Sequence, residues 1–587
     1  MFDFSIAPSA RRRRTIMLMA SVTFLMAHPR TGICESSNNG EPNIKISISS
    51  NFPSDIVGGA SNATPQQAAQ FAWEEFIALN WPAVAKTDNL SPRDTPDTSK
   101  LFGDPAPNPL VWHTFRGKVE IFPGGLVDPP GYENNSATDY GYDVRPAYIY
   151  ENGLIKPAGP APWINLDENS QISLDQIYAG VVSGKLKGSD SQILFMAKAN
   201  RVEYKYIASK RLWDEANRIK MFKATKNYIN SKSADPPAGS KSCVSFPYGS
   251  VEIKAAWRKL TSGEKWSGRF YTTRVRYYMG TGKNIRYVDD ELGLVGLHII
   301  QKTHSAPYFI YATFEQADNI TDSNGNALED ENGKFKYDYS LEASLRPDIH
   351  SVNAKPGATQ YLYPLGLFLT NPGGRLYYQN TPNTGLPADG IIFVNQRINR
   401  IPDDIIAVNK LAHEAISAYT KEKFGKWAPN SVWSYYKLIN VQATPLPGKM
   451  SSIDYSKPDA STYYQSNSVI ETDYNLQKFS GVFDGFNDTP KKLTISDFDK
   501  SPPYKALANV RYNGSTVNMG GCMGCHGNAQ GAGAGFSFIL LDGRVQTPEA
   551  AGVPVTQEQI ARLLKYLHKP EPAVGLGSAS SQQYCPD

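Results

Sequence analysis

Two segments of the chain have the hydrophobic spacing of long amphipathic helices. After Thr64, apolar residues recur on one helical face, and Gln67 completes a capping box with Thr64. Between positions 403 and 424 apolar residues again recur every three or four positions, and Gly425 follows as a C-terminal stop. The pattern therefore predicts helices over 65–81 and 403–424.

Most of the chain between these two helices instead alternates between apolar and polar residues in short runs broken by Gly, Pro, Asn and Asp. The clearest pair of runs is LVGLHIIQKT and YFIYATFEQ, joined by HSAP, which predicts a β-hairpin. A helical pattern covers 209–229, and a weaker one interrupted by Gly180 covers 174–182. The polar stretch 318–334 lacks the offsets of an EF-hand, so we expect a solvated loop there. Further strands are predicted at 118–122, 147–150, 250–257, 269–278 and 293–303.

The same pattern divides the chain into parts. Residues 28–63 are polar and predict an irregular lead-in, and the large β-rich part then runs over 64–500. The Ser-Pro-Pro sequence at 501–503 marks a domain boundary. We expect a small, mainly helical module over 501–568, and its last helix starts at Thr556. Residues 569–587 predict a loose tail. The 33 Tyr, 47 Gly and 41 Pro residues favour strands and turns over a helical bundle.

The N-terminus has the features of an export signal. Four arginines at 11–14 precede a thirteen-residue apolar stretch at 15–27, which is too short to span a bilayer comfortably. We therefore predict a signal peptide over 1–27 and a periplasmic or secreted bacterial protein. A membrane anchor, a twin-arginine signal and a lipoprotein modified at Cys34 are the alternatives. The first 27 residues carry +3 of the net charge of +4, which gives no electrostatic reason to expect nucleic acid or an anionic membrane as a partner.

A short segment near the C-terminal end carries the clearest chemistry. Residues 521–528 read GCMGCHGN, and they contain Cys522, Cys525 and His526 in the order Cys-x-x-Cys-His. Two thiols at this spacing can each add to one vinyl group of the same haem, and the next histidine then faces the iron. We therefore predict one covalently bound haem c, with Cys522 and Cys525 as anchors and His526 as the proximal iron ligand.

Three other interpretations of this motif remain open. A thioredoxin-like redox pair usually opens a helix after a strand, and the glycine-rich flanks argue against it. A zinc knuckle needs further ligands, for which His568 and Cys585 are irregularly spaced. A plain disulfide does not explain the histidine. Outside the motif, Cys34, Cys243 and Cys585 permit one disulfide in an oxidising compartment, and the sequence does not select the pair.

The second axial ligand of the iron is not specified by the sequence. No Met follows Met523, so the usual downstream methionine of soluble cytochromes c is absent. The hairpin end with Glu315 and Asp318, and its turn with Lys302 and His304, would supply acid/base groups if this edge faced the haem. The iron could also be five-coordinate or bind water. The remaining candidate ligands are His568, His298, His304, His113, His350, His413, Met279 and Met450.

Beyond the motif, several sequence segments resemble a group of large secreted bacterial proteins described as cytochrome c family proteins. These segments are AWEEFIALNWP, VEIKAAWRKL, GLHIIQKTHSAP, ATFEQADN, and CMGCHG with FSFILL. The resemblance implies a monohaem c-type cytochrome with a large N-terminal domain. The hydrophobic pattern predicts an α+β fold, with a few long helices in a large β-rich N-terminal domain and a small, mainly α, cytochrome c-like C-terminal module.

The expected function is electron transfer by a secreted monohaem c-type cytochrome. Its partner would be a redox protein or a small-molecule electron donor or acceptor, with no nucleic acid and no stable membrane span after signal removal. The alternatives are a haem-dependent, peroxidase-like oxidoreductase with its substrate pocket in the large domain, and a haem-based sensor or binding protein. The size of the large domain exceeds what a simple electron carrier needs, which keeps the enzyme alternative open.

Overall fold

A computed structural model gives the fold of the chain. It describes residues 44–85, 92–105, 109–123, 128–129, 131–133, 162–167, 193–232, 234–280, 284–320, 327–336, 360–362, 368–370, 401–447, 452–453, 467–470, 493–494, 510–512, 515–518, 521–545, 548–551 and 585. The signal peptide, Cys34, the predicted elements at 147–150 and 174–182, His350, Met450, the helix from Thr556 and His568 lie outside these residues.

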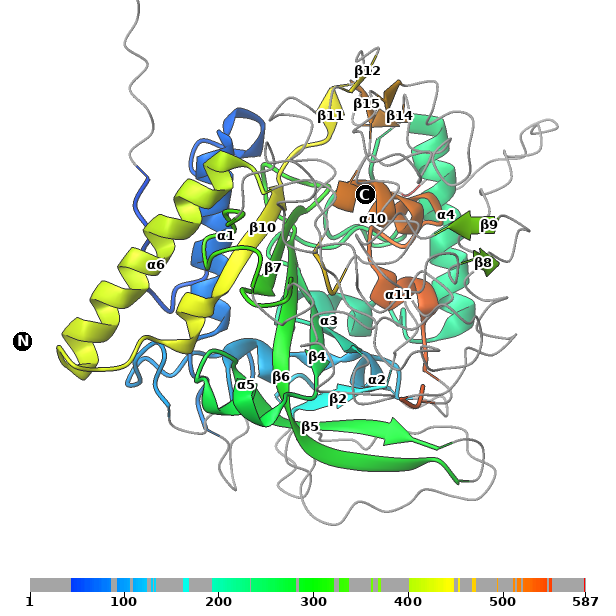
Figure 1. Cartoon of the computed structure of the whole chain (residues 1–587). Helices are drawn as coiled ribbons and strands as arrows, with labels where there is room; N and C mark the ends of the chain where they lie inside the picture. The colour runs from blue at the N-terminus through cyan, green and yellow to red at the C-terminus, as the bar shows by residue number, and fades with distance from the viewer. Residues whose placement is uncertain are drawn as a thin grey trace, which may run out of the picture. The chain divides into compact units, whose positions relative to one another are not determined.

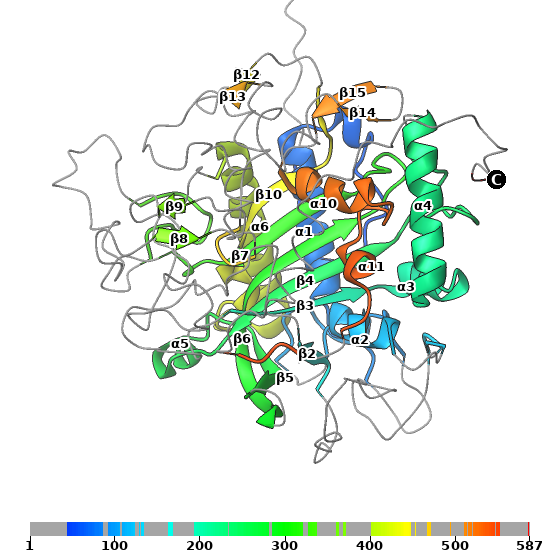
Figure 2. The same ribbon diagram turned by 90° about the vertical axis from the view of Figure 1, so that its right-hand side faces the viewer.

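The two long helices form as the hydrophobic pattern predicts. Helix α1 (Pro65–Leu79) is capped at its start by Thr64. The Thr64 side chain accepts a hydrogen bond from the Gln67 backbone N–H, and the Gln67 side chain accepts one from the Thr64 backbone N–H. Helix α6 (Asp403–Phe424) ends at Gly425, which has a φ of 99°. The two helices pack side by side (Figures 1 and 2), and Trp73 of α1 donates its ring N–H to Asn409 of α6 at 2.8 Å.

The core of the fold is an eight-stranded mixed sheet. Its main path runs β1-β3-β4-β6-β5-β2; β7 also pairs with β6, and β10 pairs with β7. All neighbours are antiparallel except β2 and β5. The predicted hairpin is confirmed as β6 and β7, and the predicted strands 250–257 and 269–278 correspond to β4 and β5. The strands are β1 (Arg116–Gly117), β2 (Ile164–Leu166), β3 (Leu194–Ala199), β4 (Val251–Arg258), β5 (Thr272–Met279), β6 (Arg286–Gln301), β7 (Ile310–Gln316) and β10 (Tyr436–Gln442).

The two faces of this sheet have different chemistry. Ile253, Ile299 and Ala312 are cross-strand neighbours and belong to the apolar core beneath α1 and α6. The alternate positions Ile300 and Tyr311 face the other way and join a second cluster with α10 (Gly521–Gly531) and α11 (Phe538–Asp542). Figures 1 and 2 show α1 and α6 on one side of the sheet and α10 and α11, with α4, on the other. The sheet therefore separates an apolar core from the layer that holds the Cys-x-x-Cys-His motif.

Smaller elements connect these layers. The short helices are η1 (Ala60–Asn62), η2 (Val111–Thr114), α5 (Ser262–Trp266) and η6 (Val432–Tyr435). Small sheets pair β8 (Gln360–Leu362) with β9 (Phe368–Thr370), β12 (Ser452–Ile453) with β13 (Leu493–Thr494), and β15 (Ser515–Asn518) with both β11 (Leu446–Pro447) and β14 (Val510–Tyr512).

The predicted strand at 118–122 is wrong. The structure has a short helix there, α2 (Lys118–Ile121), because Glu120 accepts a hydrogen bond from the Gly117 N–H at 2.8 Å. The same carboxylate forms buried ion pairs with Arg93 at 3.0 Å and Arg116 at 2.9 Å. This charge cluster, which includes Arg93 from 27 residues before Glu120, overrides the local strand pattern.

The helix predicted over 209–229 is displaced and preceded by another. Helix α3 (Arg201–Ser209) ends before a turn in which Arg211 has a φ of 51°, and α4 (Glu215–Lys232) follows. Asp214 starts α4 by accepting a hydrogen bond from the Asn217 N–H at 2.8 Å. The hydrophobic spacing located the helix, and the aspartate cap sets its first turn.

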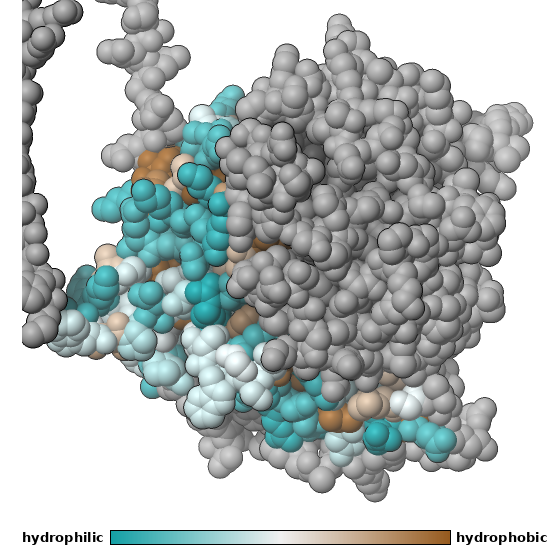
Figure 3. Space-filling view, in the orientation of Figure 1, coloured by the Kyte–Doolittle hydropathy of each residue, from teal (hydrophilic) through white to brown (hydrophobic). Residues whose placement is uncertain are grey.

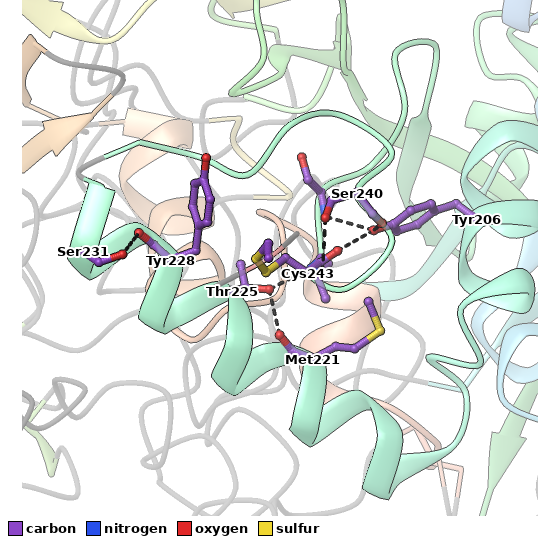
Figure 4. Close-up of a disulfide and its surroundings, with 10 residues drawn as sticks. Tyr206, Met221, Thr225, Tyr228, Ser231, Ser240 and Cys243 are labelled. Carbon is purple, nitrogen blue, oxygen red and sulfur yellow. Dashed lines mark hydrogen bonds between the residues drawn. A yellow bond between two sulfur atoms is a disulfide. The ribbon is translucent and has the colours of Figure 1, made fainter. Parts of the chain in front are cut away.

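The disulfide joins Cys243 and Cys585, with Cα atoms 5.7 Å apart, which selects one of the three pairs that the sequence left open. Figure 4 shows Cys243 beside α4, where Thr225 accepts a hydrogen bond from the Val244 N–H at 2.7 Å. The Tyr206 hydroxyl donates to the Cys243 carbonyl at 2.8 Å. The bridge therefore fixes position 585 against the layer that holds α4.

The described part of the chain thus combines helices with a mixed sheet, in agreement with the α+β prediction. Residues Ile44–Asp587 form one compact unit, and 521–545 share a hydrophobic cluster with α3 and α4. A separate module over 501–568 remains a prediction, as do the loose tail and the lead-in before residue 44.

Hydrophilic side chains predominate where the described residues reach the face seen in Figure 3. Among the large hydrophobic side chains of the described residues, Trp266 and Trp427 are the most exposed, at 89% each. Among the described helices, none combines the length and the apolar character that a membrane crossing requires.

Candidate functional site

Helix α10 carries the Cys-x-x-Cys-His motif at its start and directly follows β15. This is the strand-then-helix order of a thioredoxin-like redox pair, so the expectation that the glycine-rich flanks argue against that alternative is wrong. Cys522, Cys525 and His526 occupy positions i, i+3 and i+4, so the helical backbone places them on one face. Cys522 is buried in the second cluster, and the side chain of Cys525 lies outside the described residues. The next residue after Cys522, Met523, donates its backbone N–H to the Gln442 side chain of β10 at 3.0 Å. This bond attaches the first turn of α10 to the sheet.

The imidazole of His526 is oriented by a backbone carbonyl. Its Nδ1 lies 2.7 Å from the carbonyl oxygen of Phe536, so Nδ1 carries the proton and donates, and Nε2 keeps its lone pair. Burial lowers the pKa of His526 to about 4; the Phe536 hydrogen bond opposes this shift and Lys254 reinforces it. The ring is therefore neutral at physiological pH, in the tautomer that binds a metal through Nε2.

The glycine–alanine run after the motif brings Phe536 back to His526. Gly533 donates to the Gln530 carbonyl at 2.8 Å and has a φ of 93°, which ends α10 in a tight turn. A Cβ at Gly533 would lie 2.2 Å from the Phe222 carbonyl oxygen of α4, so only glycine fits there. The structure therefore uses this glycine for close approach to α4.

Aromatic rings surround His526. The ring centroids of Tyr311 and Phe538 each lie 4.9 Å from that of His526, and the centroid of His298 lies 6.0 Å away. Phe538 is the first residue of α11, in the apolar FSFILL segment. In the structure Ile539, with the leucines of this segment, packs in the second cluster.

The sheet contributes two cross-strand rows to this side of the structure. Lys254, His298, Thr313 and Asn440 are successive neighbours across β4, β6, β7 and β10. Glu252, Ile300, Tyr311 and Gln442 form the next row, two residues along each strand. Polar side chains at these central positions contrast with the apolar opposite face. Strand alternation could have revealed this polar face from sequence, but not what it faces.

Buried acid/base groups lie next to the motif helix. Glu203 and Glu252 are neighbouring buried carboxyl groups, and burial together with the neighbouring carboxylate raises the pKa of Glu203 well above its ordinary value. Burial also raises the pKa of Glu252, whose side chain bonds to Ser537. Asp235 accepts a hydrogen bond from Gln530 of α10, and burial raises its pKa to about 7. Sequence reasoning identified none of these three groups.

The acid/base groups proposed at the hairpin are not brought together. Lys302 donates to the Ser245 hydroxyl at 3.0 Å, and burial lowers its pKa to about 8. At the other end of the hairpin, Glu315 accepts from Ser468, and Asp318 forms a bidentate pair with Arg269 at 2.7 Å. Glu315 and Asp318 are therefore occupied by structural partners.

The other described candidate iron ligands contact other parts of the structure. His413 uses both ring nitrogens, bonding to Asn332 and to the Tyr436 carbonyl at 2.8 Å each. His113 packs against Trp112, with ring centroids 4.3 Å apart. His304 stacks on Tyr248, and Met279 lies at the end of β5. In the part of the chain that the structure describes, no group of three or more His, Cys, Asp or Glu side chains could hold a metal ion.

The chain matches no family model, no curated protein and no solved structure. The resemblance to c-type cytochromes therefore rests on the motif and phrases in the sequence alone.

Proposed function

We propose that this protein is an exported monohaem c-type cytochrome that transfers electrons. Cys522 and Cys525 would hold the haem covalently, and Nε2 of His526 would bind the iron. The sequence Cys-x-x-Cys-His supplies these three groups, and α10 presents them from one helical face.

The observation that carries the proposal is the 2.7 Å hydrogen bond between Nδ1 of His526 and the Phe536 carbonyl. Histidines that bind metals commonly donate their other ring N–H to such a group, which fixes the ring and its tautomer. A thiol redox pair or a plain disulfide gives no reason for the adjacent histidine to be held in this way. The geometry therefore favours a metal-binding role for His526 over both alternatives.

A haem c bound here would supply a one-electron redox centre. The chain's own residues support such a centre by holding the imidazole and by limiting access of water. Tyr311 and Phe538 pack against the His526 ring. Met523, in the same turn of α10, is fully buried. Low solvent access reduces the reorganisation that accompanies a charge change, which suits electron transfer.

A periplasmic or secreted location and a redox partner remain part of the proposal. The basic and apolar N-terminal segment supports export, and haem c attachment requires the same compartment. The Cys243–Cys585 disulfide is compatible with an oxidising environment.

A haem-dependent oxidoreductase is the second candidate, because buried acid/base groups adjoin the motif helix. Gln530 of α10 donates a hydrogen bond to Asp235, and Glu252, the neighbour of Glu203, lies close to Ser537 just before α11. Such groups could move protons during reaction with a substrate. Turnover of peroxide by the loaded protein would favour this candidate over a simple electron carrier.

The experiment expresses the full chain with its signal in a bacterium that has the haem c maturation system. We expect the exported protein to retain haem after denaturation and extraction with acidified solvent, and to show reversible one-electron reduction. Replacement of both Cys522 and Cys525 by Ala should abolish the retained haem. A matched double replacement of Cys243 and Cys585 should preserve it. Haem that leaves the wild-type chain on extraction, or a wild-type chain without haem, would contradict the proposal.

A further inference from the structure

We propose that Glu203 and Glu252 form a redox-linked proton site, which binds one proton from solvent when the iron gains an electron and releases that proton on reoxidation. This inference rests on the proposed function, because it requires a haem attached at Cys522 and Cys525. The electron comes from the redox partner, and the proton forms an O–H bond with a carboxylate oxygen of the pair. The two transfers together leave the net charge of the protein unchanged.

The two glutamates lie on elements that the Asn200 side chain holds together. Its Oδ1 accepts hydrogen bonds from the Glu203 N–H in α3 and from the Val251 N–H in β4, at 3.1 Å each. The Asn200 N–H in turn donates to the Val251 carbonyl at 2.9 Å. Glu252 is the next residue of β4, so the start of α3 is fixed against the start of this strand. The two carboxyl groups are therefore held as buried neighbours.

The pair has few hydrogen-bond donors. Both carboxyl oxygens of Glu203 and Oε1 of Glu252 are buried without a hydrogen-bond partner in the described part of the chain. Two ionised carboxyl groups in such surroundings would repel each other and lack compensation for the lost water, so the pair keeps one proton. A pair that holds one proton still has one carboxylate, which can accept a second.

The charged groups around the pair also leave room for a proton. Lys118 of α2 acts on Glu252, and Lys302, directly after β6, acts on both Glu203 and Asp235. Within this described set, two lysines face three carboxyl groups, and the proton already held by the pair makes the cluster neutral. Reduction removes one positive charge from the iron, which favours binding of a second proton nearby.

Glu252 adjoins the segment that orients His526. It lies close to Ser537, and the carbonyl of the preceding residue, Phe536, accepts the 2.7 Å hydrogen bond from His526. Glu252 also shares a cross-strand row with Tyr311, whose ring lies 4.9 Å from that of His526. Two strand spacings separate Glu252 from Tyr311, or roughly 10 Å. At roughly 10–15 Å and an effective dielectric constant of about 20, one unit charge shifts the pKa of another group by roughly one unit.

The test uses the full-length, haem-loaded protein as wild type, E203Q/E252Q and E75Q. Glu75 is the matched control, because it is 1% exposed and its Oε1 has no hydrogen-bond partner among the described residues, but it lies on α1, across the sheet from α10 (Figures 1 and 2). Reduction potentials are measured by spectroelectrochemical titration between about pH 5 and pH 9. The wild-type potential should fall as pH rises, because reduction takes up a proton. E75Q should follow wild type, and E203Q/E252Q should lose most of this pH dependence.

Two measurements on wild type do not depend on the folding of a variant. Reduction in weakly buffered solution should take up a fraction of a proton for each electron, reported by a pH indicator. The infrared difference spectrum between reduced and oxidised protein should gain a C=O band of a protonated carboxyl group, and this band should shift in heavy water.

The outcomes distinguish failure of the proton site from failure of the proposed function. A wild-type chain without covalent haem overturns the proposed function itself. Loaded wild type whose potential does not change with pH, or whose reduction produces no carboxyl band, overturns the proton site and leaves the covalent haem in place. An E203Q/E252Q variant with the pH dependence of wild type also overturns the site. If this variant does not fold, the infrared band of wild type decides the question.

Discussion

The imidazole of His526 is held by groups from separate parts of the chain. Its own helix supplies the backbone, the Phe536 carbonyl holds Nδ1 at 2.7 Å, and Tyr311 of the central sheet packs against the ring. The turn at Gly533 makes the Phe536 contact possible. At the residue scale, the site therefore depends on side chains and turns that the motif itself does not contain.

Lys254 tests whether the sheet tunes the proposed redox centre. Its charge lowers the pKa of both His298 and His526, after burial, so it lies close enough to act on both rings. Removing a nearby positive charge stabilises the oxidised, more positive iron. We expect K254M to lower the reduction potential by roughly tens of millivolts, measured by spectroelectrochemical titration. K254R keeps the charge and should remain near wild type; equal potentials for K254M and K254R would contradict this account.

Gly533 tests the turn that positions Phe536. G533A introduces a Cβ at a φ of 93° and 2.2 Å from the Phe222 carbonyl oxygen, so we expect a loss of about 2–5 kcal/mol in unfolding free energy. G268A is the matched control, because its φ is 68° but a Cβ there meets nothing within 4 Å. It should cost only about 1–2 kcal/mol. Denaturant unfolding measures both values, and similar losses would show that contact with α4 is unimportant.

At the scale of elements, local signals explain what the sequence could predict. Helices α1 and α6 have their own caps and hydrophobic stripes, and the β6–β7 hairpin has alternation and a proline-containing turn. Helix α2 was wrongly predicted as a strand because one of its ion-pair partners, Arg93, lies 27 residues before Glu120. The motif could be found from sequence because its groups are adjacent. The closeness of His298 to His526 could not be predicted, because strand pairing and α10 packing create it.

The Glu203–Glu252 pair connects α3 and β4 and predicts a pH dependence of stability. Burial, then the neighbouring carboxylate, raises the pKa of Glu203 in the folded protein above its ordinary value of 4.5. The folded chain therefore binds more protons than the unfolded chain, and stability falls as pH rises above about 4.5. We expect E203Q to flatten this decline in denaturant unfolding measured from pH 4.5 to 8.

Glu264 supplies a control, because its pKa is shifted in the opposite direction. Burial alone would raise the pKa of Glu264, but the Arg258 ion pair at 2.6 Å outweighs it and lowers the pKa. Glu264 therefore contributes stability that is lost as pH falls through its folded pKa. E264Q should remove stability at neutral pH and little in acid. If E203Q and E264Q change the pH profile in the same direction, the assignment of the buried pair is wrong.

At the scale of the whole molecule, the disulfide links positions 342 residues apart in the sequence. A cross-link over a long loop restricts the unfolded chain strongly, and its loss typically costs about 2–5 kcal/mol. We expect replacement of both Cys243 and Cys585 by Ala to lower the melting temperature under oxidising conditions. Reductant should lower the melting temperature of wild type but not of the variant. Equal melting temperatures without reductant would contradict a stabilising role.

Peptide mass spectrometry shows directly whether Cys522 and Cys525 are bonded to a haem. Wild-type protein isolated from the periplasm is denatured and digested, and the mass of the peptide containing residues 521–528 is measured. We expect this peptide to carry the added mass of one haem, and we expect replacement of both cysteines by Ala to remove that mass. A peptide at its unmodified mass, or one lighter by two hydrogens because the two thiols form a disulfide, would show that Cys522 and Cys525 do not hold a haem.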